Sequence, residues 1–269
     1  MAQDEAPNLT ESSTWKAMED FSEGIDTNRL AQTDALAGSR HEITLDDGHH
    51  LALDFSAAQN VSWAMTGPHL SGAGSVVYDG VAIAEGAFWV DIAPAFTPTQ
   101  SLTVVFHPTR GWALVVHSVI QDADFTTETR VTQTFHPGFV GEQSSCVRPH
   151  ETRDLIGKRT LFRYSSNHLY EHIYLSSRRF VWHNLVGEQR GHAAAELAST
   201  WKLEDGVYLF TWREEIIPVG TVFVFDYARG RSTGKFIGLS SNNGIANDRG
   251  GAEIIEFGYS NYGEYQEPV

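Results

Sequence analysis

The chain has 269 residues, and its 34 acidic against 19 basic residues give a formal net charge of −15. This balance excludes nucleic acid and anionic membranes as main partners, because phosphate binding depends on a basic face. The single cysteine excludes an intrachain disulfide framework and a thiolate zinc cluster.

Near the N-terminus, residues 12–22 (SSTWKAMEDFS) predict a short helix with one apolar stripe formed by Trp15, Met18 and Phe21. No later run reaches the roughly 20 apolar residues of a membrane helix. The acidic start of the chain is unlike a secretory signal peptide, so we expect a cytoplasmic protein without a membrane partner. A homodimer remains open.

From Ser39 onward the chain consists of short alternating runs separated by Gly, Asn, Asp and Pro, which is typical of antiparallel β structure. The pattern occurs twice. Leu36 to Trp63 aligns without a gap on Leu155 to Trp182, and Val104 to Gly111 aligns on Phe223 to Gly230 with the same offset. Self-similarity at this long period indicates two duplicated domains rather than a solenoid.

Each copy holds about eight strand-like runs with short turns and no crossover helix, which predicts a closed antiparallel barrel with room for one small ligand. The fold class is therefore all-β, with two tandem eight-stranded barrels behind a short N-terminal helix. The expected segments are a lead-in at 1–35, a first barrel at 36–137, a linker at 138–153 and a second barrel at 154–269. In the second copy we expect strands near 158–164, 169–175, 179–185, 192–201, 206–214, 219–227, 232–239 and 251–257.

The second copy has polar and aromatic side chains where the first is aliphatic. Phe162 and Tyr164 lie two apart, so they share one face of their strand, and the first copy has Ile43 and Leu45 there. The second copy has further candidates for substrate binding, which are aromatic or polar residues on the next two strands. They are Tyr170, Glu171, His172, Tyr174, Trp182 and His183.

Trp212 and Glu214 also share a face, in the segment TWREE. A carboxyl group inside a barrel is desolvated, which raises its pKa towards values useful for acid/base catalysis. Alternation leaves one question open: either Glu171 or His172 faces the interior, and the sequence does not decide which.

We expect no metal site and no cofactor. The chain has 12 histidines, but the adjacent His49 and His50 would point to opposite faces of a regular strand. No familiar nucleophile elbow, phosphate loop or metalloprotease motif is present.

The segments WKAMEDFSEGIDTNRL, LAGSRHEITLDDG, LIGKRTLFRY, YEHIY, GVYLFTWREE and TVFVFDY resemble the MoaF family, also labelled molybdenum cofactor biosynthesis factor F. The resemblance covers nearly the whole chain and implies a pair of lipocalin-like (calycin) barrels. The second copy is also distantly similar to phenolic acid decarboxylases. That similarity implies a substrate-orienting role for Tyr164 and a catalytic glutamate at Glu214, with Phe162 in place of a second tyrosine and His192, near Arg190, in place of an arginine.

Three hypotheses about function follow. The first is a cofactor-independent lyase, isomerase or cyclase that acts on a small aromatic or unsaturated compound, with Glu214, Tyr164 and His192 as catalytic residues. The second is a carrier or sensor of an apolar ligand without catalysis. The third places a site in the first barrel, around Trp63, Trp89, Asp91 and His117.

Overall fold

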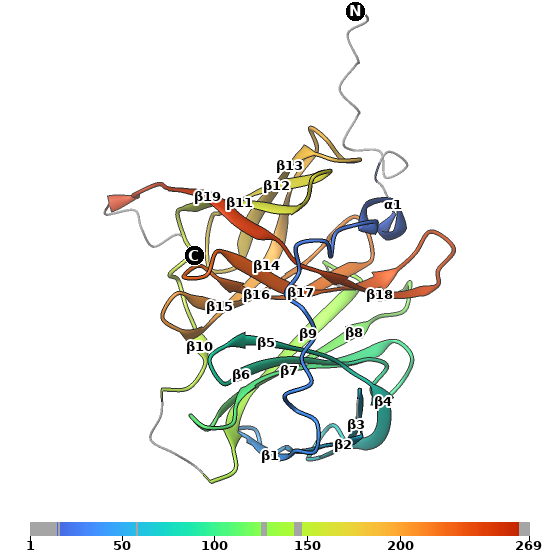
Figure 1. Cartoon of the computed structure of the whole chain (residues 1–269). Coiled ribbons are helices and arrows are strands. Elements are labelled where there is room, and N and C mark those ends of the chain that lie inside the picture. Colours follow the sequence, from blue (N-terminus) through green and yellow to red (C-terminus); the bar gives the residue numbers. More distant parts are fainter. Residues whose placement is uncertain (1–14, 16, 58, 125–127, 143–146, 264–269) are drawn as a thin grey trace, which may run out of the picture.

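The computed structural model describes residues 15, 17–57, 59–124, 128–142 and 147–263. Two antiparallel β-sheets of nine and ten strands lie one above the other, each curled around its own core, as Figure 1 shows. The predicted all-β fold with two tandem barrels is therefore confirmed. No helix in the described part of the chain combines the length and the apolar character needed to cross a bilayer.

The first sheet has the strand order β4-β3-β2-β1-β9-β8-β7-β6-β5. Among the described residues no ladder joins the two end strands β4 and β5, so this barrel is nearly closed. Its last strand continues to Val140. The strands are β1 (Arg40–Leu45), β2 (His50–Ala57), β3 (Asn60–Thr66), β4 (Gly72–Val77), β5 (Asp79–Ala84), β6 (Ala87–Ile92), β7 (Gln100–His107), β8 (Trp112–Ile120) and β9 (Val131–Val140).

The second sheet closes completely, because β14 pairs with both β13 and β15, and the closed ring has eight strands. Two further strands lie outside this ring: β10 pairs with β14, and β18 pairs with β17. The strands are β10 (His150–Glu151), β11 (Lys158–Ser165), β12 (His168–Tyr174), β13 (Arg179–Val186), β14 (Ala193–Glu204), β15 (Val207–Arg213), β16 (Val219–Asp226), β17 (Arg231–Leu239), β18 (Ile245–Gly250) and β19 (Glu253–Tyr259).

The two barrels share the same register in their first three strands. Ile43 lies opposite Leu51 in the first barrel, and their counterparts Phe162 and Tyr170 lie opposite each other in the second. Side chains alternate between the faces of a strand, so equal registers place aligned residues on the same face. The aligned positions are indeed buried in the two separate barrel cores.

The outer faces of the barrels pack together in a third apolar cluster, which includes Trp89 of β6 and Val222 of β16. This interface also contains a buried ion pair: the Lys235 Nζ of β17 bonds to Asp91 of β6 and, at 2.7 Å, to the Ser101 Oγ of β7. The two barrels are thus joined by apolar packing and by a charge pair removed from water.

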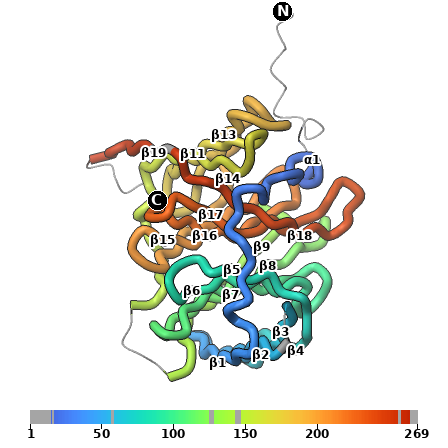
Figure 2. Tube along the Cα trace, in the orientation of Figure 1, coloured from blue at the N-terminus to red at the C-terminus, as the bar shows by residue number. Residues whose placement is uncertain are grey.

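The N-terminal segment crosses from one barrel to the other. The helix α1 (Met18–Ser22) is shorter than the predicted 12–22, and residues 12–14 and 16 lie outside the described residues. The blue tube in Figure 2 runs from α1, beside the second barrel, down past the first. The predicted apolar stripe of Trp15, Met18 and Phe21 packs against the second core.

Candidate active site in the second barrel

The inner face of β11, β12 and β13 carries a continuous aromatic surface. Tyr164, Tyr170, His172, Tyr174 and Trp182 are all buried, with exposed fractions of 7% or less. Their rings contact one another edge-on; the centroid of Tyr164 lies 5.8 Å from that of Tyr170, and Tyr170 lies 6.2 Å from Trp182. Phe162 is part of the same core, with its ring centroid 4.4 Å from that of His172.

Burial shows which member of the Glu171–His172 pair faces the interior. His172 lies inside, and Glu171 lies on the other face, where its Oε1 accepts a hydrogen bond of 2.8 Å from Arg159 Nε. His183 is on this face as well, with its Nδ1 3.6 Å from Glu171 Oε2. Glu171 and His183, both expected to bind substrate, therefore lie outside the cavity.

Glu214 follows the last residue of β15 and points into the barrel beside Trp212, as the shared face predicts. Its side chain accepts hydrogen bonds from two indoles: Trp212 Nε1 lies 2.9 Å from Oε1, and Trp182 Nε1 lies 3.3 Å from Oε2. Glu214 is only 8% exposed. Two tryptophans, one on β13 and one on β15, thus hold the carboxyl group of Glu214 in place.

A second carboxyl group, Glu196 of β14, lies beside Glu214. Glu196 is 1% exposed, and its Oε2 accepts a hydrogen bond of 2.9 Å from the backbone N–H of Glu215. Burial, and then the adjacent Glu196, raise the pKa of Glu214 well above its usual value, and burial also raises the pKa of Glu196. Two acids in contact in an apolar interior cannot both ionise easily, so the pair loses its last proton at a higher pH than an ordinary glutamate does.

Glu196 was missed by the sequence reasoning. The first eight residues of its strand, AAAELAST, are small or apolar apart from this one acid, and Glu196 shares the phase of the buried Ala198. An acid at an inward-facing position of a strand that is otherwise small or apolar indicates a buried carboxyl group, and this pattern could have identified Glu196. Gln189 was missed as well; it lies in the loop after β13, and its Oε1 accepts a hydrogen bond of 3.0 Å from the Tyr170 hydroxyl.

These groups surround a cavity of about 30 Å³, room for about two water molecules. Part of its lining is formed by Phe21 and Ile25 of the N-terminal segment, by Ile217 and by Phe236. The remaining lining residues are Tyr164, Tyr170, His172, Trp182, Gln189, Trp212 and Glu214.

The two histidines predicted at the site, His172 for substrate binding and His192 for catalysis, differ in position. His172 lines the cavity, and burial lowers its pKa to about 3, so its ring is neutral at physiological pH. His192 is buried outside the cavity lining, where its ring packs 5.9 Å from Trp15. Arg190 is exposed to solvent. The structure therefore brings Glu214, Tyr164 and His172 together, but not His192.

Comparison with known proteins identifies the family. Residues 13–122 match the MoaF N-terminal domain, and residues 149–258 match the MoaF C-terminal domain. The chain belongs to the MoaF family. It is 36% identical over 95 residues to the protein MoaF of Klebsiella aerogenes, and this alignment covers 35% of our chain and 36% of that protein. The similarity to phenolic acid decarboxylases is not shown by these comparisons.

The two MoaF domains are interlocked in space. The match to the N-terminal domain begins at residue 13 and so includes α1. Yet Phe21 of α1 packs against Phe236 of the C-terminal domain, with ring centroids 6.0 Å apart. A segment of the first MoaF domain therefore contributes to the lining of the cavity in the second.

The residues of the third hypothesis do not form one site in the MoaF N-terminal domain. Trp63 lies inside the first barrel, and Phe96 connects it to His117 at ring-centroid distances of 5.0 and 5.4 Å. Trp89 and Asp91 instead face the second barrel. The proposed group is thus divided between the interior and the outer face.

Proposed function

We propose that the second barrel binds a small aromatic or unsaturated compound and converts it by acid/base catalysis, as a lyase, isomerase or cyclase. One observation carries this proposal: Glu214 and Glu196 lie side by side in an aromatic interior, where burial and the neighbouring carboxyl group raise the pKa of Glu214 and an ionised pair would be costly. A carboxylic acid that stays protonated at neutral pH can donate that proton to a substrate.

The roles follow from the positions of the side chains. Glu214 donates the proton of the pair to an unsaturated carbon or a leaving oxygen of the substrate, and the indole N–H groups of Trp182 and Trp212 stabilise the carboxylate that remains. The pair then takes a proton back from the neighbouring atom of the substrate. Such a sequence moves protons only, so it balances without an oxidant, a reductant or a cofactor.

Substrate orientation comes from groups that are neutral at physiological pH. The hydroxyl groups of Tyr164 and Tyr170 are buried, and burial raises both of their pKa values, so both act as hydrogen-bond donors rather than phenolates. Trp182 and Trp212 provide flat walls on which an aromatic ring can stack. A neutral, aromatic site of this kind favours an uncharged or singly charged ring compound over a sugar or a nucleotide.

The cavity must open before such a compound enters. Ligand pockets usually measure about 300–1,000 Å³, far above the volume enclosed here. Phe21 and Ile25 line the cavity, and both belong to the N-terminal segment, whose described residues form no strand of the barrel ring. We propose that this segment moves aside to admit the ligand.

The test compares wild type with Glu214→Gln and Glu196→Gln in a screen of aromatic acids, catechols and amines. Tryptophan fluorescence and calorimetry measure binding, and mass spectrometry measures products. We expect a new product from wild type, its loss in Glu214→Gln with binding largely retained, and a strong reduction in Glu196→Gln. Glu171→Gln is the matched control, because it removes a carboxylate from the outer face of the same barrel. Turnover retained in Glu214→Gln would refute the assignment.

A carrier or sensor is the second candidate. It is favoured by the hydrogen bonds that both oxygens of Glu214 already accept from tryptophans, which suit a structural acid as well as a catalytic one. This function predicts binding without any change in mass, with equal affinity in wild type and Glu214→Gln.

A further inference from the structure

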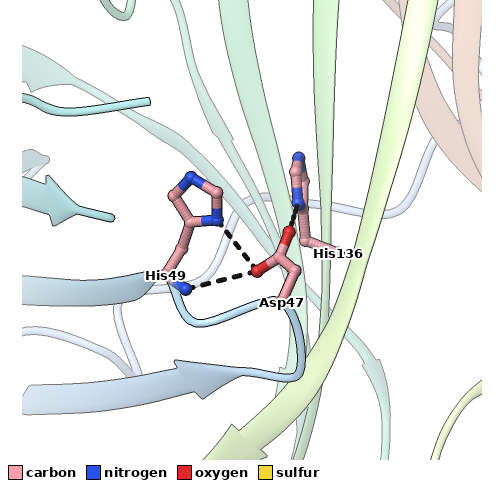
Figure 3. A group of neighbouring side chains, drawn as sticks. All are labelled: Asp47, His49 and His136. Atoms are coloured by element: carbon pink, nitrogen blue, oxygen red, sulfur yellow. Dashed lines mark hydrogen bonds and ion pairs between the residues drawn. The ribbon is translucent and has the colours of Figure 1, made fainter. Parts of the chain in front are cut away.

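A cluster of two histidines and one aspartate lies at one end of the first barrel, far from the proposed active site in sequence and in space. Asp47 belongs to the turn between β1 and β2, His49 leads into β2, and His136 lies on β9 (Figure 3). The backbone N–H of Asp46 bonds to the Pro137 carbonyl at 2.9 Å, which holds the turn against β9.

Both imidazoles converge on one carboxylate. His49 Nδ1 lies 2.9 Å from Asp47 Oδ1, and His136 Nδ1 lies 2.5 Å from Asp47 Oδ2. The side chains of His49 and His136 are 3% and 8% exposed, whereas that of Asp47 is 42% exposed. Two buried nitrogen donors and one partly exposed oxygen donor therefore meet at a point that solvent can reach.

Both rings form their hydrogen bonds through Nδ1. The Nε2 atoms of His49 and His136 are buried, and neither has a hydrogen-bond partner among the described residues. Asp47, the acceptor of both bonds, therefore holds the two ring protons on Nδ1. A cation between the three side chains would take the place of these two protons, with both Nδ1 lone pairs facing the ion.

The three donor atoms are of the kind that transition-metal ions bind. Imidazole nitrogen and carboxylate oxygen are common ligands of such ions. The candidate ligand atoms of Asp47, His49 and His136 all lie within 4.8 Å of one another.

The turn of the second barrel lacks this arrangement. Its aligned residues are Ser166, Asn167 and His168, so it retains the histidine without the carboxylate, and His168 Nδ1 pairs with Ser165 Oγ at 2.9 Å. These three side chains therefore occur together in the first barrel, and the aligned turn of the second barrel does not repeat them.

We infer that Asp47, His49 and His136 form a binding site for one divalent transition-metal ion of the zinc class. Two imidazole nitrogens and one carboxylate oxygen suit Zn²⁺, Co²⁺, Ni²⁺ or Cu²⁺, whereas Ca²⁺ and Mg²⁺ prefer sites built from oxygen. Three protein ligands leave at least one position for water on the exposed side of Asp47. The nitrogen and oxygen atoms would separate slightly on binding, because metal–ligand bonds of about 2.0–2.2 Å replace the two hydrogen bonds.

The ion would also join two parts of the first barrel that share few hydrogen bonds. The ladder between β1 and β9 covers only Ile43–Leu45 and residues 138–140. An ion held by the β1–β2 turn and by β9 crosses this seam, so binding should stabilise the first barrel as well as fill the site.

The experiment titrates the full-length protein, first treated with a chelator, with Zn²⁺ by calorimetry and with Co²⁺ by visible absorption. We expect one ion per chain, a visible absorption spectrum typical of Co²⁺ in a coordination site of low symmetry, and a higher melting temperature with Zn²⁺. His49→Gln and His136→Gln should each weaken binding by about 100-fold. His50→Gln is the matched control, because His50 is adjacent in sequence but exposed, and it should bind like wild type.

Asp47→Asn keeps the size of the side chain and covers the case in which a histidine variant does not fold. Far-ultraviolet circular dichroism checks the fold of each variant. The inference is overturned if wild type binds no Zn²⁺, if His136→Gln or Asp47→Asn binds as tightly as wild type while folded, or if His50→Gln loses binding to the same extent.

Discussion

Replacing Glu214 by glutamine should change how the stability of the protein depends on pH. Because the folded pKa of Glu214 is raised above its ordinary value of 4.5, the folded state retains a proton that the unfolded chain releases as the pH rises. The stabilisation associated with this proton is complete below about pH 4.5 and is lost progressively as the pH rises towards the folded pKa. The loss amounts to about 1.4 kcal/mol per pH unit for one proton.

The glutamine variant has no such proton to retain. Its amide oxygen can accept from Trp212 and its amide N–H can donate to Glu196, but the Trp182 N–H loses its acceptor, at a cost of about 1–3 kcal/mol. We therefore expect Glu214→Gln to be less stable than wild type near pH 5. With each further pH unit the difference should narrow by about 1.4 kcal/mol and can reverse.

Urea unfolding at intervals from pH 5 to pH 8, followed by tryptophan fluorescence, measures both curves. Glu171→Gln, on the outer face, controls for the loss of a carboxylate as such. If the unfolding free energies of wild type and Glu214→Gln change in parallel over this pH range, Glu214 retains no proton in the folded state. The basis of the proposed acid catalysis would then be wrong.

Three further outcomes follow from the packing. Lys235→Met should cost about 3–5 kcal/mol of unfolding free energy, because it leaves Asp91 charged and buried, and adding Asp91→Leu should recover most of it; urea unfolding measures both. His172→Phe should make the unfolding free energy depend less on pH in acid. Wild type loses about 1.4 kcal/mol of unfolding free energy per pH unit between pH 6.5 and about pH 3, because the unfolded chain binds a proton there and the buried ring does not. Phe21→Ala should speed association of any ligand of the second barrel several-fold in stopped-flow fluorescence, whereas Phe96→Ala, in the first barrel, should not.

The fold was largely predictable because strands have a period of two and the chain repeats itself. Because the repeat aligns without gaps, Ile43 and Phe162 must lie on corresponding faces of their strands. The residues of one core therefore predict those of the other. The short β10 and the added β18 were not predicted, because strands outside a closed ring have no counterpart in the repeat.

The site was only partly predictable. Alternation shows that Glu171 and His172 face opposite ways, but which one faces the interior depends on the pairing of β11 with β12 and its packing. The Glu214–Glu196 contact joins two strands, and the contact between Asp47 and His136 joins residues 89 positions apart. Contacts of this kind depend on closure of the barrel, which a single sequence does not reveal.

The crossing of α1 onto the second barrel has a consequence for how this chain can be divided. A cut in the linker would separate two complete sheets, yet the C-terminal piece would lose Phe21 and Ile25 and expose an aromatic cavity to water. During synthesis this segment leaves the ribosome before the second barrel and finds its docking surface only after the strands of that barrel are made. The duplicated halves are therefore no longer independent modules, and any attempt to transplant the second barrel must carry the first 30 or so residues with it.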